Sequence, residues 1–526
     1  MRQLSITLGA TLIAVVIACG QAFSQISETE ILASEPNDDD QFGSDVGVDG
    51  DRVIVGATFN DERALDAGAA YIFEWNESTW VQSKLTASDA HEDQRFGRSV
   101  AISGSYAVVG AYRDDEKGEK AGAVYIFKSE SGTWNQKAKL TALDDAEADR
   151  FGVSVDIDGG RRVIVGAYLG GDDSCAAEGF AYIFDRDYGA ETWSQRAKLT
   201  SAAPACSSTF GYSVSVSGNR CVVGEPQGDF VQPPTLVGSA YIFATTDGIS
   251  WIHEATLAPP AGDGENGDKF GKSVTMDGNN VVVGAQGEDD GPDQPQMIGS
   301  AYYWQRTTGK TWEYKQKIRP SLCETEDDFG RSVSVAGSHL IIGSTGRDKV
   351  SPSVTNAGGA FLFRLNTTTG LWEQQNEIFA GDAGQNDLFG IDVSIGSTYA
   401  VVGFNRHEHD GAGRNRGAAS IYAGFDVLGK VENAGQLKDS VGFSMQNYPN
   451  PCNPTTIIKY QMPADLNVSV KIYDMLGREV LTLVDGFQEA GQHQIVLDAS
   501  QLASGVYFYR LIAGSFSDVK KLLVAK

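Results

Sequence analysis

The stretch FGRSVAISGSYAVVGA fills residues 96–111, and its pattern occurs seven times along the 526-residue chain. Each copy begins with a Phe-Gly pair, and successive pairs are separated by 54 to 60 residues. The seven phenylalanines are Phe42, Phe96, Phe151, Phe210, Phe270, Phe329 and Phe389. A fixed period of this length is typical of a structural unit that buries its core by stacking on its neighbours.

Each repeat contains four strand patterns. In the second repeat we predict strands at Ser99–Ser103, Tyr106–Ala111, Ala123–Phe127 and Trp134–Thr141. The second strand is continuously apolar, which indicates burial on both faces, whereas the fourth carries charges, which suits an outer edge. Two-residue turns are predicted between the first two strands, because Gly supplies the positive φ of such turns. The predicted turn pairs are Asp49-Gly50, Ser103-Gly104, Ser217-Gly218 and Asp277-Gly278.

Four antiparallel strands per repeat, arranged radially, predict an all-β fold with a seven-bladed β-propeller over residues 25–424. The seventh copy ends at Ile421-Tyr422 and lacks its fourth strand. Glu30–Ala33 precedes Phe42 at the offset at which Lys84–Ala87 precedes Phe96. The N-terminal segment is therefore expected to complete blade 7 and close the ring.

The pattern F-G, V-G-A and G-x-A-Y-I-F resembles the FG-GAP repeat over residues 26–424. That family builds the seven-bladed propeller of integrin α subunits and of many bacterial surface proteins. The Asp-rich calcium loop of integrins has no counterpart between strands one and two, where this chain has tight turns. The resemblance therefore implies the fold but not the integrin calcium sites.

The N-terminus has the composition of a secretory signal. Arg2 precedes an apolar run from Leu8 to Ala18, and Ala22-Phe23-Ser24 is a small-residue cleavage site. Residues 1–24 are therefore predicted to be a signal peptide that is cleaved between Ser24 and Gln25.

An alternative interpretation of the N-terminus starts from Val16–Cys19, which resembles a lipobox and would make Cys19 a lipidated anchor. No other apolar stretch approaches the ~20 residues that a membrane-spanning helix needs. No transmembrane segment is therefore expected.

Five cysteines follow the predicted cleavage site, and an odd number leaves at least one unpaired. They are Cys175, Cys206, Cys221, Cys323 and Cys452. Cys221 lies in an apolar strand and is predicted to be a core residue. Cys175 and Cys206 lie in loops of adjacent blades on one predicted face, and they are the candidate disulfide.

The repeat pattern ends at residue 424, and the sequence that follows has a different character. Residues 425–444 are linker-like, and residues 445–526 alternate strands with turns, which predicts a small Ig-like β-sandwich. This segment begins with NYPNPCNPTT at residues 447–456 and resembles the type A C-terminal sorting domain of type IX secretion cargo. Motif positions are occupied by Pro449, Asn450, Pro451, Asn453, Pro454, Thr455, Gly477 and Gly505, whereas Cys452 stands where Phe is common.

The resemblance of residues 445–526 to this sorting domain implies a partner and a location. The implied partner is the type IX secretion machinery, which carries such proteins across the outer membrane. We therefore expect an extracellular or outer-surface protein of a Gram-negative bacterium.

The formal net charge of −27 argues against nucleic acid and anionic membranes as partners. None of the six histidines has a Ser or Cys partner recognisable by spacing. His407-Glu408-His409-Asp410 is the one metal-like cluster, and a charged surface loop is favoured over a metal site there. We therefore expect a monomeric, non-catalytic propeller that serves in binding or adhesion to a protein or glycan. The alternative functions are an extracellular hydrolase and a carbohydrate-binding module.

A carbohydrate-binding module could stack sugars on the Trp residue that recurs in strand four, although that Trp can also be a structural anchor. The recurring residues are Trp80, Trp134, Trp193, Trp251, Trp312 and Trp372.

Acidic residues recur at three positions of the repeat. Either they bind Ca²⁺ through oxygen ligands or they accept backbone N–H groups in turns. The candidate calcium residues that follow strand two are Asp61, Asp115, Asp172, Asp229, Asp289 and Asp348. Two residues before the Phe stand Asp40, Asp149, Asp268, Asp327 and Asp387, and seven residues before it stand Glu35, Asp89, Asp144, Asp263 and Asp382. Turn stabilisation is the favoured interpretation, and no other cofactor is expected.

Overall fold

The computed structural model describes two parts of the chain, residues 26–425 and 444–524, with short gaps. The gaps are residues 145–147, 172–177, 188–190, 203–207, 227–236, 266, 290–296, 322–323, 351–352, 409–413, 449–454, 463–465, 475–477, 489–490, 504 and 514–515. The predicted signal peptide, its cleavage site at Ser24–Gln25 and most of the predicted linker lie outside the described residues. The chain divides into two compact units, residues 1–430 and 431–526.

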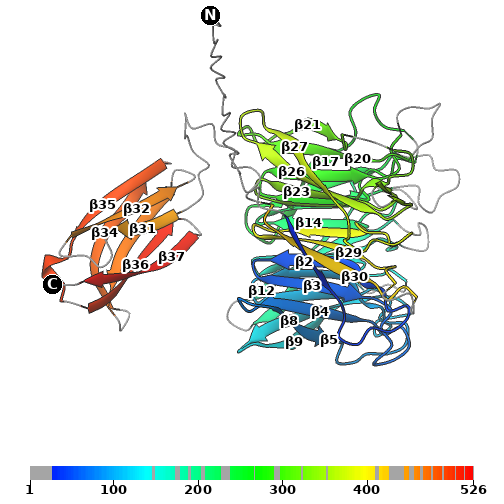
Figure 1. Ribbon diagram of the computed structural model, residues 1–526, viewed down its shortest axis with the longest axis horizontal. Coiled ribbons are helices and arrows are strands. Elements are labelled where there is room, and N and C mark those ends of the chain that lie inside the picture. Colours follow the sequence, from blue (N-terminus) through cyan, green and yellow to red (C-terminus); the bar gives the residue numbers. More distant parts are fainter. Residues whose placement is uncertain are drawn as a thin grey trace, which may run out of the picture. The chain divides into compact units, whose positions relative to one another are not determined.

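The described strands of the first unit form seven four-stranded antiparallel sheets, one for each repeat (Figure 1). Blades 1 and 2 consist of β2 (Phe42–Asp49), β3 (Arg52–Ala57), β4 (Ala69–Trp75), β5 (Trp80–Leu85), β6 (Phe96–Ser103), β7 (Tyr106–Ala111), β8 (Ala123–Glu130) and β9 (Thr133–Leu140). Blades 3 and 4 consist of β10 (Ser154–Asp158), β11 (Arg162–Ala167), β12 (Phe180–Asp187), β13 (Thr192–Leu199), β14 (Ser213–Ser217), β15 (Arg220–Glu225), β16 (Ser239–Thr245) and β17 (Trp251–Leu257).

Blades 5 and 6 consist of β18 (Ser273–Asp277), β19 (Asn280–Ala285), β20 (Ser300–Arg306), β21 (Trp312–Ile318), β22 (Phe329–Ala336), β23 (His339–Ser344), β26 (Gly359–Asn366) and β27 (Leu371–Ile378). A two-stranded ribbon, β24 (Lys349–Val350) and β25 (Ser353–Val354), interrupts blade 6. Blade 7 consists of β28 (Asp392–Ile395), β29 (Tyr399–Phe404), β30 (Ala418–Ala423) and β1 (Ser27–Ile31).

Burial follows the predicted order of strands within a blade. All six residues of β7 are buried, whereas β9 alternates between exposed and buried residues. The predicted turns need a correction of one residue, since Asp49 pairs with Arg52 and the turn is therefore Gly50-Asp51. Gly50 still carries the positive φ, at 56°, so the chemistry of the turn is as expected although its position is shifted.

The ring is closed by the two ends of the first unit. β1 pairs antiparallel with β30, from Ser27 opposite Ala423 to Ile31 opposite Ala419. In Figure 1 the blue N-terminal strand accordingly lies beside the yellow-orange β30. Ile31 also shares a core with Phe42 of blade 1, so β1 belongs to blade 7 and helps to pack its neighbour.

The Phe-Gly pair makes each joint between blades. Phe96 packs in a core formed by Ile54 and Ile72 of blade 1 together with Tyr125 of blade 2. Gly97 has a φ of +87°, and a Cβ atom there would lie 2.1 Å from the carbonyl oxygen of Ala69. The Phe therefore fills the joint, and the Gly allows the backbone to cross the preceding blade closely.

Side chains of strand one link successive blades around the axis. The carboxylate of Asp156 accepts the Val216 N–H at 2.7 Å, and the Ser215 hydroxyl accepts the Met276 N–H at 3.1 Å. The Ser394 hydroxyl accepts the Val48 N–H at 3.1 Å, across the joint between blades 7 and 1. The inner strands are thereby connected in register through this joint.

The six Trp residues of strand four contact the preceding blade. Trp80 meets Tyr399, Trp193 meets Tyr106 and Trp372 meets Tyr303, with ring centroids 5.0, 6.2 and 5.7 Å apart. The others contact Glu74 (Trp134), Arg162 (Trp251) and Glu254 (Trp312). These contacts support the structural interpretation of the Trp set over a sugar-stacking surface.

The second unit contains two sheets that share one core. β31 (Ser444–Tyr448), β32 (Thr455–Met462) and β35 (Gly491–Asp498) form one sheet, and β33 (Leu466–Tyr473), β34 (Glu479–Gln488), β36 (Gly505–Ala513) and β37 (Phe516–Val524) form the other. A short 3-10 helix, η2 (Ala499–Gln501), follows β35. Ile458 and Leu497 of the first sheet pack with Val470 and Leu511 of the second. The unit is therefore a small β-sandwich.

We expect Gly97→Ala to destabilise the propeller far more than Gly104→Ala in the same blade. Both glycines have a positive φ, 87° and 56°, so both variants bear the left-handed strain. Only at Gly97 would the new methyl group meet backbone, whereas nothing lies within 4 Å at Gly104. Thermal unfolding should show a much larger drop in midpoint for Gly97→Ala, and equal drops would contradict this account of the joint.

Candidate functional site

An axial cavity of about 680 Å³ runs along the centre of the propeller. Strand one of all seven blades contributes to its lining. The first strand begins at the end of the blade where the loops after strands two and four also lie, because the four strands are antiparallel. One mouth of the cavity therefore opens in the loop face.

Cationic side chains gather near this mouth. The residue that follows the Phe-Gly pair lines the cavity in every blade, and it is Arg98 in blade 2, Lys272 in blade 5 and Arg331 in blade 6. The Lys272 ammonium lies 4.2 Å from the ring centroid of Tyr212, and Arg331 Nη1 donates to Gln286 Oε1 at 3.2 Å. Among the described residues, the Arg98 guanidinium has no hydrogen bond or ion pair.

The effect of these cations is visible on a neighbouring phenol. Burial raises the pKa of Tyr212, but Lys272, Arg98 and Arg331 outweigh it and lower that pKa below its ordinary value. These three cations lie close to one phenol on a chain whose net charge is −27. Such a cavity can bind an anion.

Two half-buried carboxyl groups, Asp45 and Asp392, line the cavity at the joint between blades 7 and 1. Asp392 accepts the Val46 N–H at 2.8 Å, and Asp45 accepts the Val100 N–H at 2.6 Å. Burial and the adjacent Asp392 raise the pKa of Asp45, so the pair tends to hold a proton and does not cancel the cations fully. Asp45 and Asp392 occupy the repeat position of Ser99 and Ser332, whose hydroxyls donate to carbonyls of the next blade. Their place in the repeat indicates a role in joining blades.

Four of the candidate calcium residues lie within the described loops, and each accepts a backbone N–H. Asp61 and Asp115 accept from Asp66 and Lys120, both at 2.6 Å. Asp289 and Asp348 accept from Met297 at 2.5 Å and from Asn356 at 2.7 Å. All four donors have a positive φ. These bonds support turn stabilisation, and calcium binding at these residues stays a prediction.

Several residues named in the sequence predictions lie outside the part of the chain that the structure describes. They are Asp172, Cys175, Cys206, Asp229, Cys323, His409, Asp410 and Cys452. The candidate disulfide between Cys175 and Cys206 is therefore still a prediction. Cys221 is described and is fully buried in the core of blade 4, and burial raises the pKa of its thiol.

Most described blades contain a partly buried group of ion pairs beneath the loop face, which we call the ion-pair pocket. It combines the penultimate residue of strand four with acidic residues of the adjoining loops. In blade 2, Lys139 contacts Asp89 at 2.6 Å and Asp114 at 2.9 Å. In blade 5, Lys317 contacts Asp263 at 2.6 Å and Glu288 at 2.5 Å. Lys84 and Lys198 form equivalent pairs in blades 1 and 3.

Blades 6 and 7 exchange the charges of this pocket. Strand four supplies Glu377 in blade 6 and Glu30 in blade 7, where blades 1, 2, 3 and 5 have Lys and blade 4 has Thr256. The loop after strand two supplies the cation instead. Arg347 contacts Glu377 at 2.7 Å, Asp327 at 3.2 Å and Glu324 at 3.4 Å. The equivalent loop residue in blade 7 is His407.

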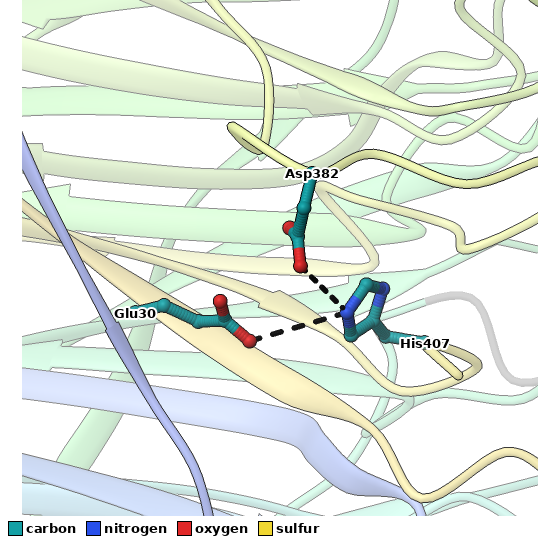
Figure 2. A group of neighbouring side chains, drawn as sticks. All are labelled: Glu30, Asp382 and His407. Atoms are coloured by element: carbon teal, nitrogen blue, oxygen red, sulfur yellow. Dashed lines mark ion pairs between the residues drawn. The ribbon is translucent and has the colours of Figure 1, made fainter. Parts of the chain in front are cut away.

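His407 is buried, which corrects its interpretation as part of a charged surface loop. Glu408 beside it is exposed. His407 Nδ1 lies 2.7 Å from Asp387 Oδ2, and its Nε2 lies 3.1 Å from Asp382 Oδ2 and 4.0 Å from Glu30 Oε1. Figure 2 shows the last two carboxylates pointing at the imidazole from different segments. The prediction for residues 407–410 was wrong about His407 because it considered only its neighbours in the sequence as partners.

The electrostatics of this cluster favour positive charge. Burial lowers the pKa of His407, but Asp387, Asp382 and Glu30 outweigh it and raise that pKa. Burial, followed by the nearby Asp382, raises the pKa of Glu30. The cluster can therefore hold either an imidazolium or a metal ion.

Sequence reasoning missed the cations of the cavity. The signal was present, because aligning the seven repeats places Arg or Lys directly after the Phe-Gly pair in three of them. Glu30 was noticed only as part of the closing strand, because its partners lie in loops far along the chain.

The FG-GAP repeat matches seven segments of the chain, which together cover more than half of it. They are residues 26–73, 80–127, 134–184, 193–243, 251–303, 312–363 and 372–422. The protein therefore belongs to the FG-GAP repeat family. Residues 446–525 match the secretion system C-terminal sorting domain, so the second unit is a domain of that kind.

Three solved structures to which the chain is similar have TM-scores below 0.5. PorZ, a surface component of the type IX secretion system of Porphyromonas gingivalis, is 14% identical with a TM-score of 0.41; the match covers 94% of this chain and 61% of PorZ, so this chain spans about three fifths of its length. Sqt1 of Saccharomyces cerevisiae is 10% identical with a TM-score of 0.40, covering 88% and 97% of the two chains. A putative 6-phosphogluconolactonase from Bacteroides uniformis is 13% identical with a TM-score of 0.44, covering 67% and 89%.

No curated protein matches the chain. Within the part of the chain that the structure describes, no helix has the length and apolarity to cross a membrane.

We expect the thermal midpoint to be higher at pH 5 than at pH 8. Burial raises the pKa of Asp268 to about 7 and those of Asp149 and Asp156 to about 6. Between roughly pH 4 and pH 7 the folded state then binds more protons than the unfolded state, so stability falls as the pH rises. Calorimetry should show a difference of at least roughly 2 °C.

Asp268→Asn provides the control for this pH dependence. Asp268 faces Glu265, Glu288 and Asp289, and an amide removes its ionisation while its oxygen can still accept the Glu265 N–H. The variant should lose less stability between pH 5 and pH 8 than the parent. A midpoint that rises steadily from pH 5 to pH 8 in the parent would contradict the raised pKa values.

Proposed function

We propose that the protein is carried across the outer membrane by a type IX secretion system. The match of residues 446–525 to a sorting domain supports this step. The propeller would then act outside the cell or on the outer surface of a Gram-negative bacterium. The sorting domain has its own core, and so does each blade joint, so the two units can serve export and function separately.

We further propose that the propeller is a non-catalytic binding or adhesion module. The observation that carries this proposal is the axial cavity of about 680 Å³ with Arg98, Lys272 and Arg331 near its mouth. A protein or glycan ligand would place a carboxylate, sulfate or phosphate group there. Arg can bind such a group through two parallel N–H donors.

Two carboxyl groups of the cavity lining, Asp45 and Asp392, accept backbone N–H groups of neighbouring blades, which supports a structural role for this pair. A hydrolase that uses this pair remains the alternative function, because buried carboxyl groups that share a proton can act as acid and base.

We expect the double variant Arg98→Gln/Arg331→Gln to bind acidic ligands at least tenfold more weakly than the parent. Neither guanidinium forms an ion pair with a carboxylate among the described residues, so the fold should persist, and a melting curve of the variant checks this. An array of uronate, sulfated and neutral glycans, followed by calorimetry on any hit, measures the effect. Lys137→Gln is the matched control, because Lys137 pairs with Glu130 on the exposed outer strand.

Two outcomes would contradict the anion site. One is equal binding by the double variant and the parent, and the other is no preference for acidic over neutral glycans or peptides. Hydrolysis of a ligand that stops in Asp392→Asn would favour the hydrolase instead.

Deleting Met445–Lys526 in the native host should trap the propeller inside the cell envelope, because the sorting domain is absent. Fractionation with an antibody to the propeller measures its location, and a melting curve of the truncated protein checks that it still folds. Propeller found outside these cells would contradict the proposed export route.

A further inference from the structure

We propose that Glu30, Asp382 and His407 bind one Zn²⁺ ion at the point where β1 closes the ring (Figure 2). One oxygen or nitrogen from each residue lies within 4.8 Å of those of the others. The three donors come from β1, from the loop after β27 and from the loop after β29. The ion would therefore connect three segments that lie far apart in the sequence or in different loops.

The orientation of His407 suits a metal ligand. Its Nδ1 lies 2.7 Å from Asp387 Oδ2, and a carboxylate can only accept, so Nδ1 carries a proton. In the neutral imidazole the lone pair is then on Nε2, which is the nitrogen directed at Asp382 and Glu30. A carboxylate that orients a metal-binding His in this way is the usual outer partner of such ligands.

Comparison with blade 6 separates this cluster from an ordinary ion-pair pocket. There the Arg347 guanidinium, with five N–H donors, contacts Glu377, Asp327 and Glu324 together. An imidazolium has only two N–H donors, which Asp387 and Asp382 would occupy. Glu30, the counterpart of Glu377, lies 4.0 Å from Nε2. A divalent ion can bind both carboxylates and the nitrogen at once.

The geometry and donor set favour Zn²⁺. Tetrahedral ligands at about 2.1 Å from zinc lie about 3.4 Å from one another. The Nε2 distances of 3.1 Å to Asp382 and 4.0 Å to Glu30 bracket this value. The side chains of Asp382 and Glu30 are 52% and 31% exposed, so they can adjust and leave room for water as a fourth ligand. Ca²⁺ prefers six to eight oxygen ligands and does not suit this site.

The test uses the full mature chain, purified through a tag without histidine and freed of metal with a chelator. Calorimetric titration with ZnCl₂ should show one site per chain, and neither MgCl₂ nor CaCl₂ should compete for that site. The melting midpoint should rise with zinc concentration, because the ion binds only the folded state. Hydrogen exchange of residues 27–31 should slow, which reports directly on β1.

His407→Arg is the decisive variant, because it copies Arg347 of blade 6 and keeps a cation while removing the metal ligand. Asp382→Asn is the second variant. Because the Asp382 side chain is exposed, this substitution should leave the fold intact. Both should bind zinc at least tenfold more weakly and lose the zinc-dependent slowing of exchange in β1. The proposal is overturned if the parent has no stoichiometric zinc site, or if His407→Arg binds zinc as the parent does.

Discussion

The close crossing of each Phe-Gly pair over the preceding blade is the contact on which the rest of the propeller depends. At every joint the Phe forms a parallel bridge with the Gly that precedes strand three of the neighbouring blade, from Gly68 with Phe96 to Phe42 with Gly417. Both glycines of such a crossing have a positive φ, and a Cβ on either would meet backbone. The spacing between blades is therefore set by backbone contact, and the buried Phe fills what remains.

This crossing also explains where chemistry can vary. The residue after the Phe-Gly pair must line the axial cavity, and the residue two positions before it must lie beneath the loop face. Arg98 and Ile391 share the first position, and Gln94 and Asp387 share the second. Because the backbone holds the joint, these side chains can differ between blades without loss of the ring. Each blade can therefore place a different side chain in the cavity and beneath the loop face.

The fold could be predicted from the sequence because a period repeated seven times removes most of the alternatives. The turns were misplaced by one residue, since Gly can occupy either position of a two-residue turn and only the pairing of Asp49 with Arg52 decides. The site was less accessible. Arg98, Lys272 and Arg331 are separated by whole blades, and only the radial arrangement brings them to one cavity. His407 looked like a metal ligand among its sequence neighbours, but the described groups around it are Glu30, Asp382 and Asp387.

Blade 7 differs from the other blades because its sheet joins the two ends of the propeller chain. In the other blades strand four is tethered to strand three by a short connection, whereas β1 has no such connection to β30 and is held by backbone pairing and side-chain packing. Glu28 adds side-chain anchors, accepting from the Ser420 hydroxyl at 2.7 Å and the Tyr422 hydroxyl at 3.1 Å. The pocket there also departs from the Lys or Arg of blades 1, 2, 3, 5 and 6 by using His407. The least tethered strand therefore lies beside an ion-pair pocket whose cationic group is an imidazole, and the proposed zinc ion would act on ring closure at this joint.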